Sequence, residues 1–227
     1  MRQSDVPRLK DLQKYNVNRR GEYEGIRQTF FDAATYIGAT GQTQLQFFQT
    51  PQGQGSPVKT IVDTNMNSAG QLPQPQHFLA ESVELLFFPG VLPTIASTGG
   101  AGSVAVPEFV NDVYTFAKSG SLNFFIGSKT YLEEAPLNRF PPKTKLVVNS
   151  SHALQVEQAL AANQEDVVST AYAACSGRPY FLDPPVLLVP NQNFSITLNW
   201  PTAIALPSLV DARVHVVLDG ILYRQSQ

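Results

Sequence analysis

The feature of the sequence that most constrains the fold is a succession of short apolar segments separated by turn residues. Near residue 196, Phe194, Ile196 and Leu198 alternate with polar side chains, which is the two-residue period of a strand with one buried face. Runs of β-branched and aromatic residues between turns favour a mainly β chain. Eight segments are expected to be strands: Thr43–Thr50, Val58–Asp63, His77–Phe88, Ser121–Glu133, Thr144–Val148, Tyr180–Val189, Asn193–Trp200 and Arg213–Arg224.

Turn and helix signals complete the expected order of elements. Asp219-Gly220 separates two apolar runs and predicts a two-residue hairpin turn. Glu108–Lys118 has apolar residues at helical spacing with a glycine just beyond its end, and Ser151–Ala174 is rich in alanine with serine at its start. Both are expected to be helices, and Phe30–Ile37 is a weaker third candidate.

Eight strands with uneven connections and one or two inserted helices predict an eight-stranded jelly-roll sandwich. A doubly wound α/β fold would need helices that alternate regularly with strands. Residues 1–40 are expected to form a basic, partly helical N-terminal arm. Residues 41–227 are expected to form a single jelly-roll domain, with helical insertions near 108–118 and 151–174. A compact double jelly roll is the alternative, although sixteen strands would leave little chain for each.

Basic charge is concentrated in the first twenty residues, which contain Arg2, Arg8, Lys10, Lys14, Arg19 and Arg20. Six basic and two acidic side chains give this segment a net charge of +4, whereas the other 207 residues contain ten basic and sixteen acidic side chains. We expect the arm to contact an anionic partner, either nucleic acid or lipid headgroups. The alternative is a short amphipathic helix whose Leu9, Leu12 and Tyr15 pack on the body.

The chain contains few charged residues, 15% against a usual value of about 25%. Loops 51–57 and 69–76 are rich in Gln, Gly and Pro instead. Such uncharged polar surfaces contact neighbouring molecules without the cost of desolvating charge. The low charge therefore favours a subunit of an assembly, and the alternative is that these loops are simply solvated.

No catalytic or cofactor-binding motif is recognisable in the sequence. Gly99–Ser103 lacks the Lys-Ser/Thr pair of a phosphate-binding loop, and the three histidines are far apart. Cys175 is the single cysteine, follows two alanines and is expected to be a small buried residue. We expect neither enzymatic activity nor a metal or cofactor. A carboxylate pair assembled from distant segments is the alternative that sequence cannot show.

Four segments, Thr43–Thr50, Asp63–Gly70, Pro75–Leu85 and Ala212–Leu222, resemble jelly-roll capsid proteins of tailless icosahedral bacteriophages. The resemblance implies a shell-forming subunit without catalytic residues or a small-molecule substrate. It implies copies of the same chain and other capsid proteins as partners, and a place in the virion after synthesis in the host cytoplasm. In that group N-terminal segments commonly face the interior, so the basic arm would contact the genome or an internal membrane.

The expected function is therefore that of a viral structural protein, a self-assembling capsid subunit of an icosahedral shell around the genome. A major shell protein, a vertex protein and a cement protein are equally compatible with the sequence. The alternative from another class is a lectin-like β-sandwich that binds carbohydrate, for which Tyr180, Trp200 and Tyr223 are the aromatic candidates.

Overall fold

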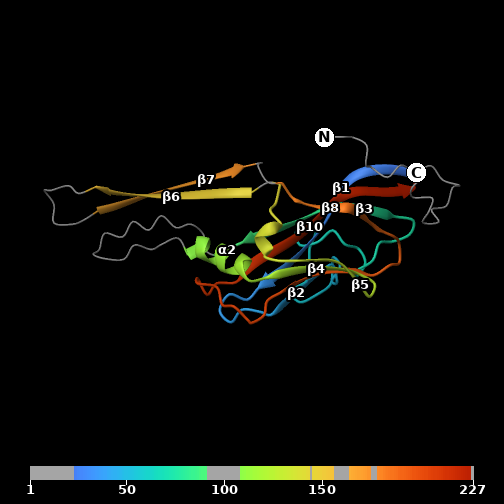
Figure 1. The fold of residues 1–227 in the computed structure, drawn as a ribbon, viewed down its shortest axis with the longest axis horizontal. Helices are drawn as coiled ribbons and strands as arrows, with labels where there is room; N and C mark the ends of the chain where they lie inside the picture. Colours follow the sequence, from blue (N-terminus) through green and yellow to red (C-terminus); the bar gives the residue numbers. More distant parts are fainter. Residues whose placement is uncertain (1–22, 91–107, 144, 156–163, 175–177, 226–227) are drawn as a thin grey trace.

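The computed structural model describes residues 23–90, 108–143, 145–155, 164–174 and 178–225 (Figure 1). Strands dominate this part of the chain, as the apolar alternation predicts. The strands are β1 (Tyr23–Tyr36), β2 (Gln44–Phe47), β3 (His77–Phe88), β4 (Ser121–Ile126), β5 (Lys129–Glu134), β6 (Lys145–Gln155), β7 (Gln164–Ala174), β8 (Tyr180–Leu188), β9 (Phe194–Asn199) and β10 (Ala212–Gln225). Helix α2 (Glu108–Lys118) and the 3₁₀ turn η2 (Leu137–Arg139) complete the elements.

Eight of the strands form two antiparallel sheets in a sandwich-like arrangement. Sheet A has the order β1-β10-β3-β8, and sheet B has the order β2-β9-β4-β5. The pairing is nested along the chain, because β1 pairs with β10, β2 with β9, β3 with β8 and β4 with β5. The remaining strands, β6 and β7, pair only with each other among the described strands. Figure 1 shows their hairpin extending away from the sheets.

The core lies between the two sheets and is built from alternate residues of each strand. Sheet B buries Leu122, Phe124 and Ile126 of β4, whereas the residues between them are only half-buried. Sheet A contributes Val214 and Val216 from β10 to the same cluster. Burial of these apolar side chains is the main favourable term in the stability of such a sandwich.

Aromatic side chains close the core at the end that α2 covers. The ring of Trp200 lies 5.1 Å from that of Tyr36 and 5.2 Å from that of Phe116, between ring centroids. The indole Nε1 of Trp200 donates a hydrogen bond to the carbonyl of Phe116 at 3.1 Å. The Tyr36 hydroxyl donates to the carbonyl of Ile204 at 2.6 Å. These contacts fix α2 at the position predicted for a helix, residues 108–118.

The prediction of a helix over residues 151–174 is wrong. This segment contains the last part of β6 and the whole of β7. The two strands pair in register from Lys145 with Ala174 to Gln155 with Gln164. Alanine and glutamine favour helices only weakly, by tenths of a kcal/mol per residue. The β-branched pairs Val147-Val148 and Val167-Val168 favour strands, and a continuous antiparallel ladder outweighs the helical preference.

The expected boundary of the arm at residue 40 is also wrong, because β1 occupies residues 23–36 and belongs to sheet A. It pairs with β10 along its whole length, and Phe30, Asp32 and Tyr36 are buried on its inner side. Phe30–Ile37 is accordingly a strand and not a helix. The helical arm itself, within residues 1–22, lies outside the described residues.

Three further predictions about strands are corrected. Asp219-Gly220 forms no hairpin turn but an irregularity inside β10, where the register to β3 shifts. Ser121–Glu133 is two strands, joined by a turn with Gly127 at φ 59°. Val58–Asp63 is a set of turns. Glycine at position 220 instead allows the backbones of β10 and β3 to come close together, since a Cβ there would lie 1.9 Å from the carbonyl oxygen of Leu79.

Candidate functional site

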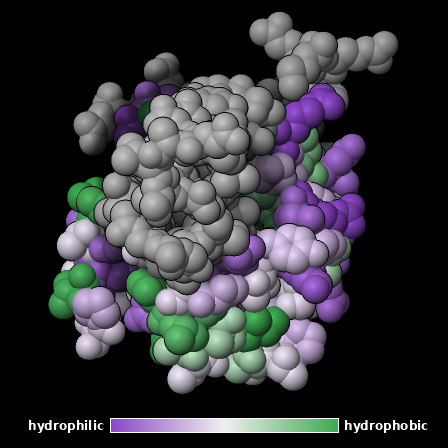
Figure 2. Space-filling view, turned by 90° about the vertical axis from the view of Figure 1, so that its left-hand side faces the viewer, coloured by the Kyte–Doolittle hydropathy of each residue, from purple (hydrophilic) through white to green (hydrophobic). Residues whose placement is uncertain are grey.

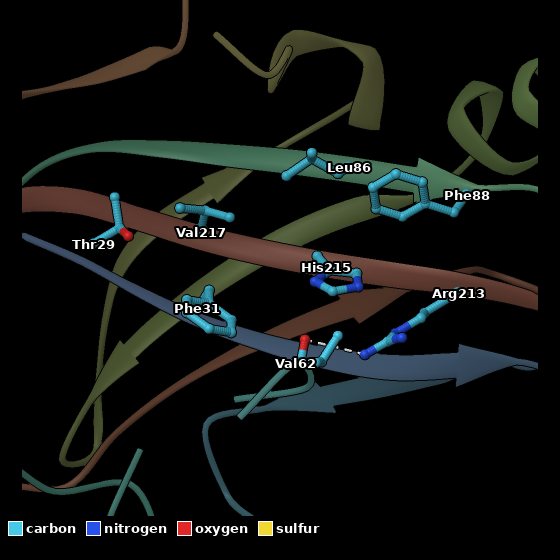
Figure 3. Close-up of a pocket in the computed structure, with 8 residues that line it drawn as sticks. All are labelled: Thr29, Phe31, Val62, Leu86, Phe88, Arg213, His215 and Val217. Carbon is cyan, nitrogen blue, oxygen red and sulfur yellow. Dashed lines mark hydrogen bonds between the residues drawn. The ribbon is translucent and has the colours of Figure 1, made fainter. Parts of the chain in front are cut away.

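A shallow groove of about 490 Å³ crosses the outer face of sheet A, the face turned away from sheet B. Figure 3 shows its side chains on one side of β1, β10 and β3, with one residue from the loop beside β1. We call this the sheet A groove. It is lined by Thr29, Phe31, Val62, Leu86, Phe88, Arg213, His215 and Val217.

The groove is apolar, although it lies on a face that would ordinarily be polar in a two-sheet sandwich. Its floor consists mainly of Phe31, Leu86 and Val217. Phe88 and Val62 remain 45% and 63% exposed. The opposite side of β3 faces the core, where Val83 and Leu85 are buried. The end of β3 at Leu86 and Phe88 is therefore apolar on both faces, which is the pattern of a strand segment covered on both sides.

Charged and titratable groups stand along one side of the groove. Arg213 forms an ion pair with Asp63 and donates a hydrogen bond to the carbonyl of Val62 at 3.1 Å. The imidazole of His215 packs edge-on against the ring of Phe88, with centroids 5.3 Å apart. Burial lowers the pKa of His215, and the positive charge of Arg213 lowers it further. The groove therefore favours a neutral imidazole.

Acidification is expected to destabilise the protein through the buried His77 and the half-buried His215. Burial lowers the pKa of His77 and of His215 below 6.5, so the unfolded chain takes up protons first as the pH falls. Stability that is present above about pH 6.5 is then lost on acidification, by at most about 1.4 kcal/mol per pH unit for each histidine. Urea unfolding at pH 7.5, 6.5 and 5.5 measures this loss. It should be smaller in His215→Gln, and an unchanged pH dependence in that variant would contradict the assignment.

A cluster of ion pairs lies next to the groove on the same face. Asp219 of β10 is almost fully buried and forms ion pairs with Arg27 and Lys143. Arg27 also contacts Glu81 at 2.8 Å, and the main-chain N–H of Lys143 donates to Glu84 Oε2 at 2.9 Å. Buried carboxylates require such partners, because an unpaired charge in the interior costs several kcal/mol.

This ionic cluster fixes the place where the β6–β7 hairpin leaves the body. Lys143 lies two residues before β6, and the Leu85 N–H donates to the carbonyl of Phe140 at 2.9 Å. Residues 140–143 are thus held against β3. In the described part of the chain no cluster of three or more His, Cys, Asp or Glu side chains is arranged to hold a metal ion. The groups are arranged as ion pairs that anchor the chain.

The exposed edges of the two sheets are protected against pairing with other strands. Along the outer edge of β1, Asn65 takes the place of a neighbouring strand: its Oδ1 accepts from the Phe31 N–H at 3.0 Å, and its Nδ2 donates to the Thr29 carbonyl at 2.7 Å. On the opposite edge, β8 contains Pro184-Pro185, which lack N–H donors. In sheet B, β2 has only 4 residues, and β5 is exposed and charged. These are devices by which sheets avoid edge-to-edge association.

The site residues expected from sequence lie outside the described residues: Arg2, Arg8, Lys10, Lys14, Arg19 and Arg20. Cys175 lies outside them as well. Of the aromatic residues considered for a carbohydrate site, Trp200 and Tyr223 are buried. The ring of Tyr180 packs on Phe140, and its hydroxyl donates to Glu134. These three side chains are therefore used inside the fold.

Sequence reasoning missed the sheet A groove and the ionic cluster. The apolar residues on both faces of His77–Phe88 are visible in the sequence and could have indicated a covered outer face. The cluster could not have been found that way, since Arg27, Lys143 and Asp219 are far apart in the chain and meet only through strand register.

No family model, no curated protein and no solved structure matches this chain. A search of the described helices finds none that is both long and apolar enough to cross a membrane. The observations that bear on function are therefore those of the chain itself: a mainly β two-sheet sandwich, an extended hairpin and an apolar groove.

Proposed function

We propose that this chain is a self-assembling structural subunit, and specifically a jelly-roll capsid subunit of an icosahedral viral shell. The observation that carries the proposal is the β6–β7 hairpin. Each of its strands has 11 residues, and Figure 1 shows it projecting from the body. A lone two-stranded hairpin is marginally stable in water, so a hairpin of this length favours a chain that pairs or packs with neighbouring molecules.

The hairpin is also the element best suited to strand pairing with another molecule. Its strands contain no proline, and Lys145, Glu165 and Asp166 are their only formally charged residues. Both outer edges of the hairpin are without a partner strand among the described residues, whereas the edges of sheets A and B are protected. An unprotected edge is a template for pairing with a second chain.

The nested pairing of the strands supports the jelly-roll part of the proposal. When β6 and β7 are set aside, the first strand pairs with the last, the second with the second-last, and so on inward to β4 with β5. This order arises when one long hairpin wraps around a sandwich. The hairpin β6–β7 and the helix α2 are then insertions between successive strands. The resemblance of residues 43–50, 63–70, 75–85 and 212–222 to phage capsid proteins supports the viral part of the proposal. Contact of the basic arm with genome or membrane stays a prediction.

The proposal is tested by removing the hairpin. Because Lys145 and Ala174 pair at its base, a Gly-Ser linker of a few residues can replace residues 145–174 without separating the flanking segments. The full chain should form particles visible by negative-stain electron microscopy. The shortened chain should keep the thermal unfolding transition of the body, because the core residues whose burial the structure describes lie in other elements, and should form no particles.

Two results would contradict the proposal. A full chain that sediments as a monomer up to its solubility limit, without forming particles, would exclude self-assembly. Normal particles from the shortened chain would show that the hairpin is not the assembling element. As a matched control, Ser128→Ala changes an exposed residue of the turn between β4 and β5, and particle yield should not change.

A further inference from the structure

An exposed apolar turn, Leu209-Val210, lies next to the sheet A groove, and we call it the apolar turn. Leu209 is 61% exposed and Val210 43%. Ile37, also exposed, follows the end of β1 nearby, where Gly38 lies against the backbone of Val210. Figure 2 shows the molecule from the end where α2 lies, and hydrophobic surface is gathered on that end.

The apolar turn is held rigidly in a conformation that its sequence disfavours. Leu209 has φ 58°, the left-handed region in which a leucine side chain is strained. Asp112 of α2 anchors the turn and is fully buried. Its carboxylate accepts hydrogen bonds from the N–H and the hydroxyl of Ser208, at 3.0 and 2.5 Å. Backbone strain that the surroundings enforce is concentrated at functional positions.

The groove and the apolar turn are neighbours on one surface. A Cβ added to Gly90 would lie 2.7 Å from Val210 Cγ1, and Gly90 is two residues beyond Phe88, at the end of the groove. A hollow and a projection side by side make a surface complementary to itself. A two-fold rotation can then place the turn of each molecule in the groove of the other.

The charges on this surface favour a second copy of the chain as the occupant. Outside the first twenty residues the chain is acidic, with sixteen acidic and ten basic side chains, so two copies generally repel each other. The groove instead carries one cation and one anion, Arg213 and Asp63, already joined as an ion pair. Because this pair is already satisfied within each molecule, the groove adds no net charge to the repulsion between two copies, whereas nucleic acid would require unpaired cations.

We infer that the sheet A groove and the apolar turn form a two-fold interface in which each copy inserts Leu209-Val210 into the groove of the other. The inference rests on the proposed self-assembly and adds to it a contact separate from the hairpin. The protected edges of sheet A direct this contact to the face of the sheet. A stable interface buries about 800 Å² on each partner, so the groove and turn would be its centre and the surrounding surface its rim.

The decisive variant is Leu209→Gly, because it moves folding and association in opposite directions. Glycine removes the strain at φ 58°, so the melting temperature should equal or exceed that of the unaltered chain. It also removes the inserted side chain, so self-association measured by sedimentation velocity should weaken roughly tenfold or more. Phe88→Glu, at the exposed end of the groove, should weaken association to a similar degree.

Tyr131→Ser is the matched control, because Tyr131 is an exposed aromatic residue of sheet B, 53% accessible, and its loss should leave association unchanged. If neither Leu209→Gly nor Phe88→Glu changes association, the proposed interface is wrong. That result is the one expected if a segment of the same molecule fills the groove. If the full chain still forms particles in that case, the proposed function stands without the interface. A full chain that never associates would contradict both.

Discussion

Replacing Gly220 by alanine should lower the free energy of unfolding by about 3 kcal/mol, toward the upper end of the cost of overpacking. The added Cβ would lie 1.9 Å from the carbonyl oxygen of Leu79 and 3.0 Å from the ring of Phe78. Backbone cannot move aside as a flexible side chain does, so β3 and β10 must separate in the middle of sheet A. For a domain of this size we expect the melting temperature to fall by roughly 10 °C, measured by circular dichroism.

Gly25→Ala provides the control for this prediction. Gly25 lies on the neighbouring strand β1, and its added Cβ would contact only side chains, at 3.3 Å from Tyr223 and 3.4 Å from Ile221. Those side chains can adjust by a few tenths of an ångström, so the loss should stay below about 1 kcal/mol. Equal losses in Gly220→Ala and Gly25→Ala would show that close approach of the backbone is not the reason for glycine at 220.

Asp32→Ala should destabilise the protein by about 3–5 kcal/mol, the usual cost of removing one partner of a buried ion pair. Asp32 is fully buried. Its carboxylate accepts from the Phe48 N–H and from Lys59 Nζ, both at 2.6 Å. Phe48 is buried at φ 69°, so the bond from Asp32 stabilises a strained backbone as well. Urea unfolding of the variant should show an early transition in which β2 and the loop at Lys59 lose their anchor.

The pH dependence of the same group separates its charge from its hydrogen bonds. Burial raises the pKa of Asp32 above 3.8, because desolvation outweighs the attraction of Lys59. The folded state therefore holds this proton more tightly, and the contribution of Asp32 to stability decreases as the pH rises from 3.8 through its folded pKa. Asp32→Asn, which keeps an acceptor without charge, should remove that decrease. If Asp32→Asn retains the wild-type pH profile in this range, another group is responsible.

The parts of the fold that could be predicted from sequence are those in which the local pattern of apolar and polar side chains matches one type of element. The segments His77–Phe88 and Glu108–Lys118 have clear apolar periodicity, and the structure contains β3 and α2 at those residues. Ser151–Ala174 carries mixed propensities, and a long-range ladder decides its conformation. Asp219-Gly220 has the sequence of a turn, but Asp219 is used by ion pairs and Gly220 by close packing.

The candidate site was beyond sequence analysis for a different reason. The sheet A groove requires β1, β10 and β3 to lie side by side in one register, and these strands are far apart in the chain. No local pattern encodes that arrangement. The association that the low charge favours stays a prediction, and the surface proposed for it comes from β1, β3 and β10 and from Leu209-Val210.

The nested order of strands has a consequence for biosynthesis. Glu24 of β1 and Arg224 of β10 form an ion pair across 200 residues of chain, so sheet A is incomplete until its last strand has left the ribosome. Contacts of such long sequence separation make folding slow, and a domain generally folds as one unit during synthesis. Because the groove needs β10 beside β1 and β3, nascent chains lack this surface until β10 is made, so the association proposed for it can begin only after that.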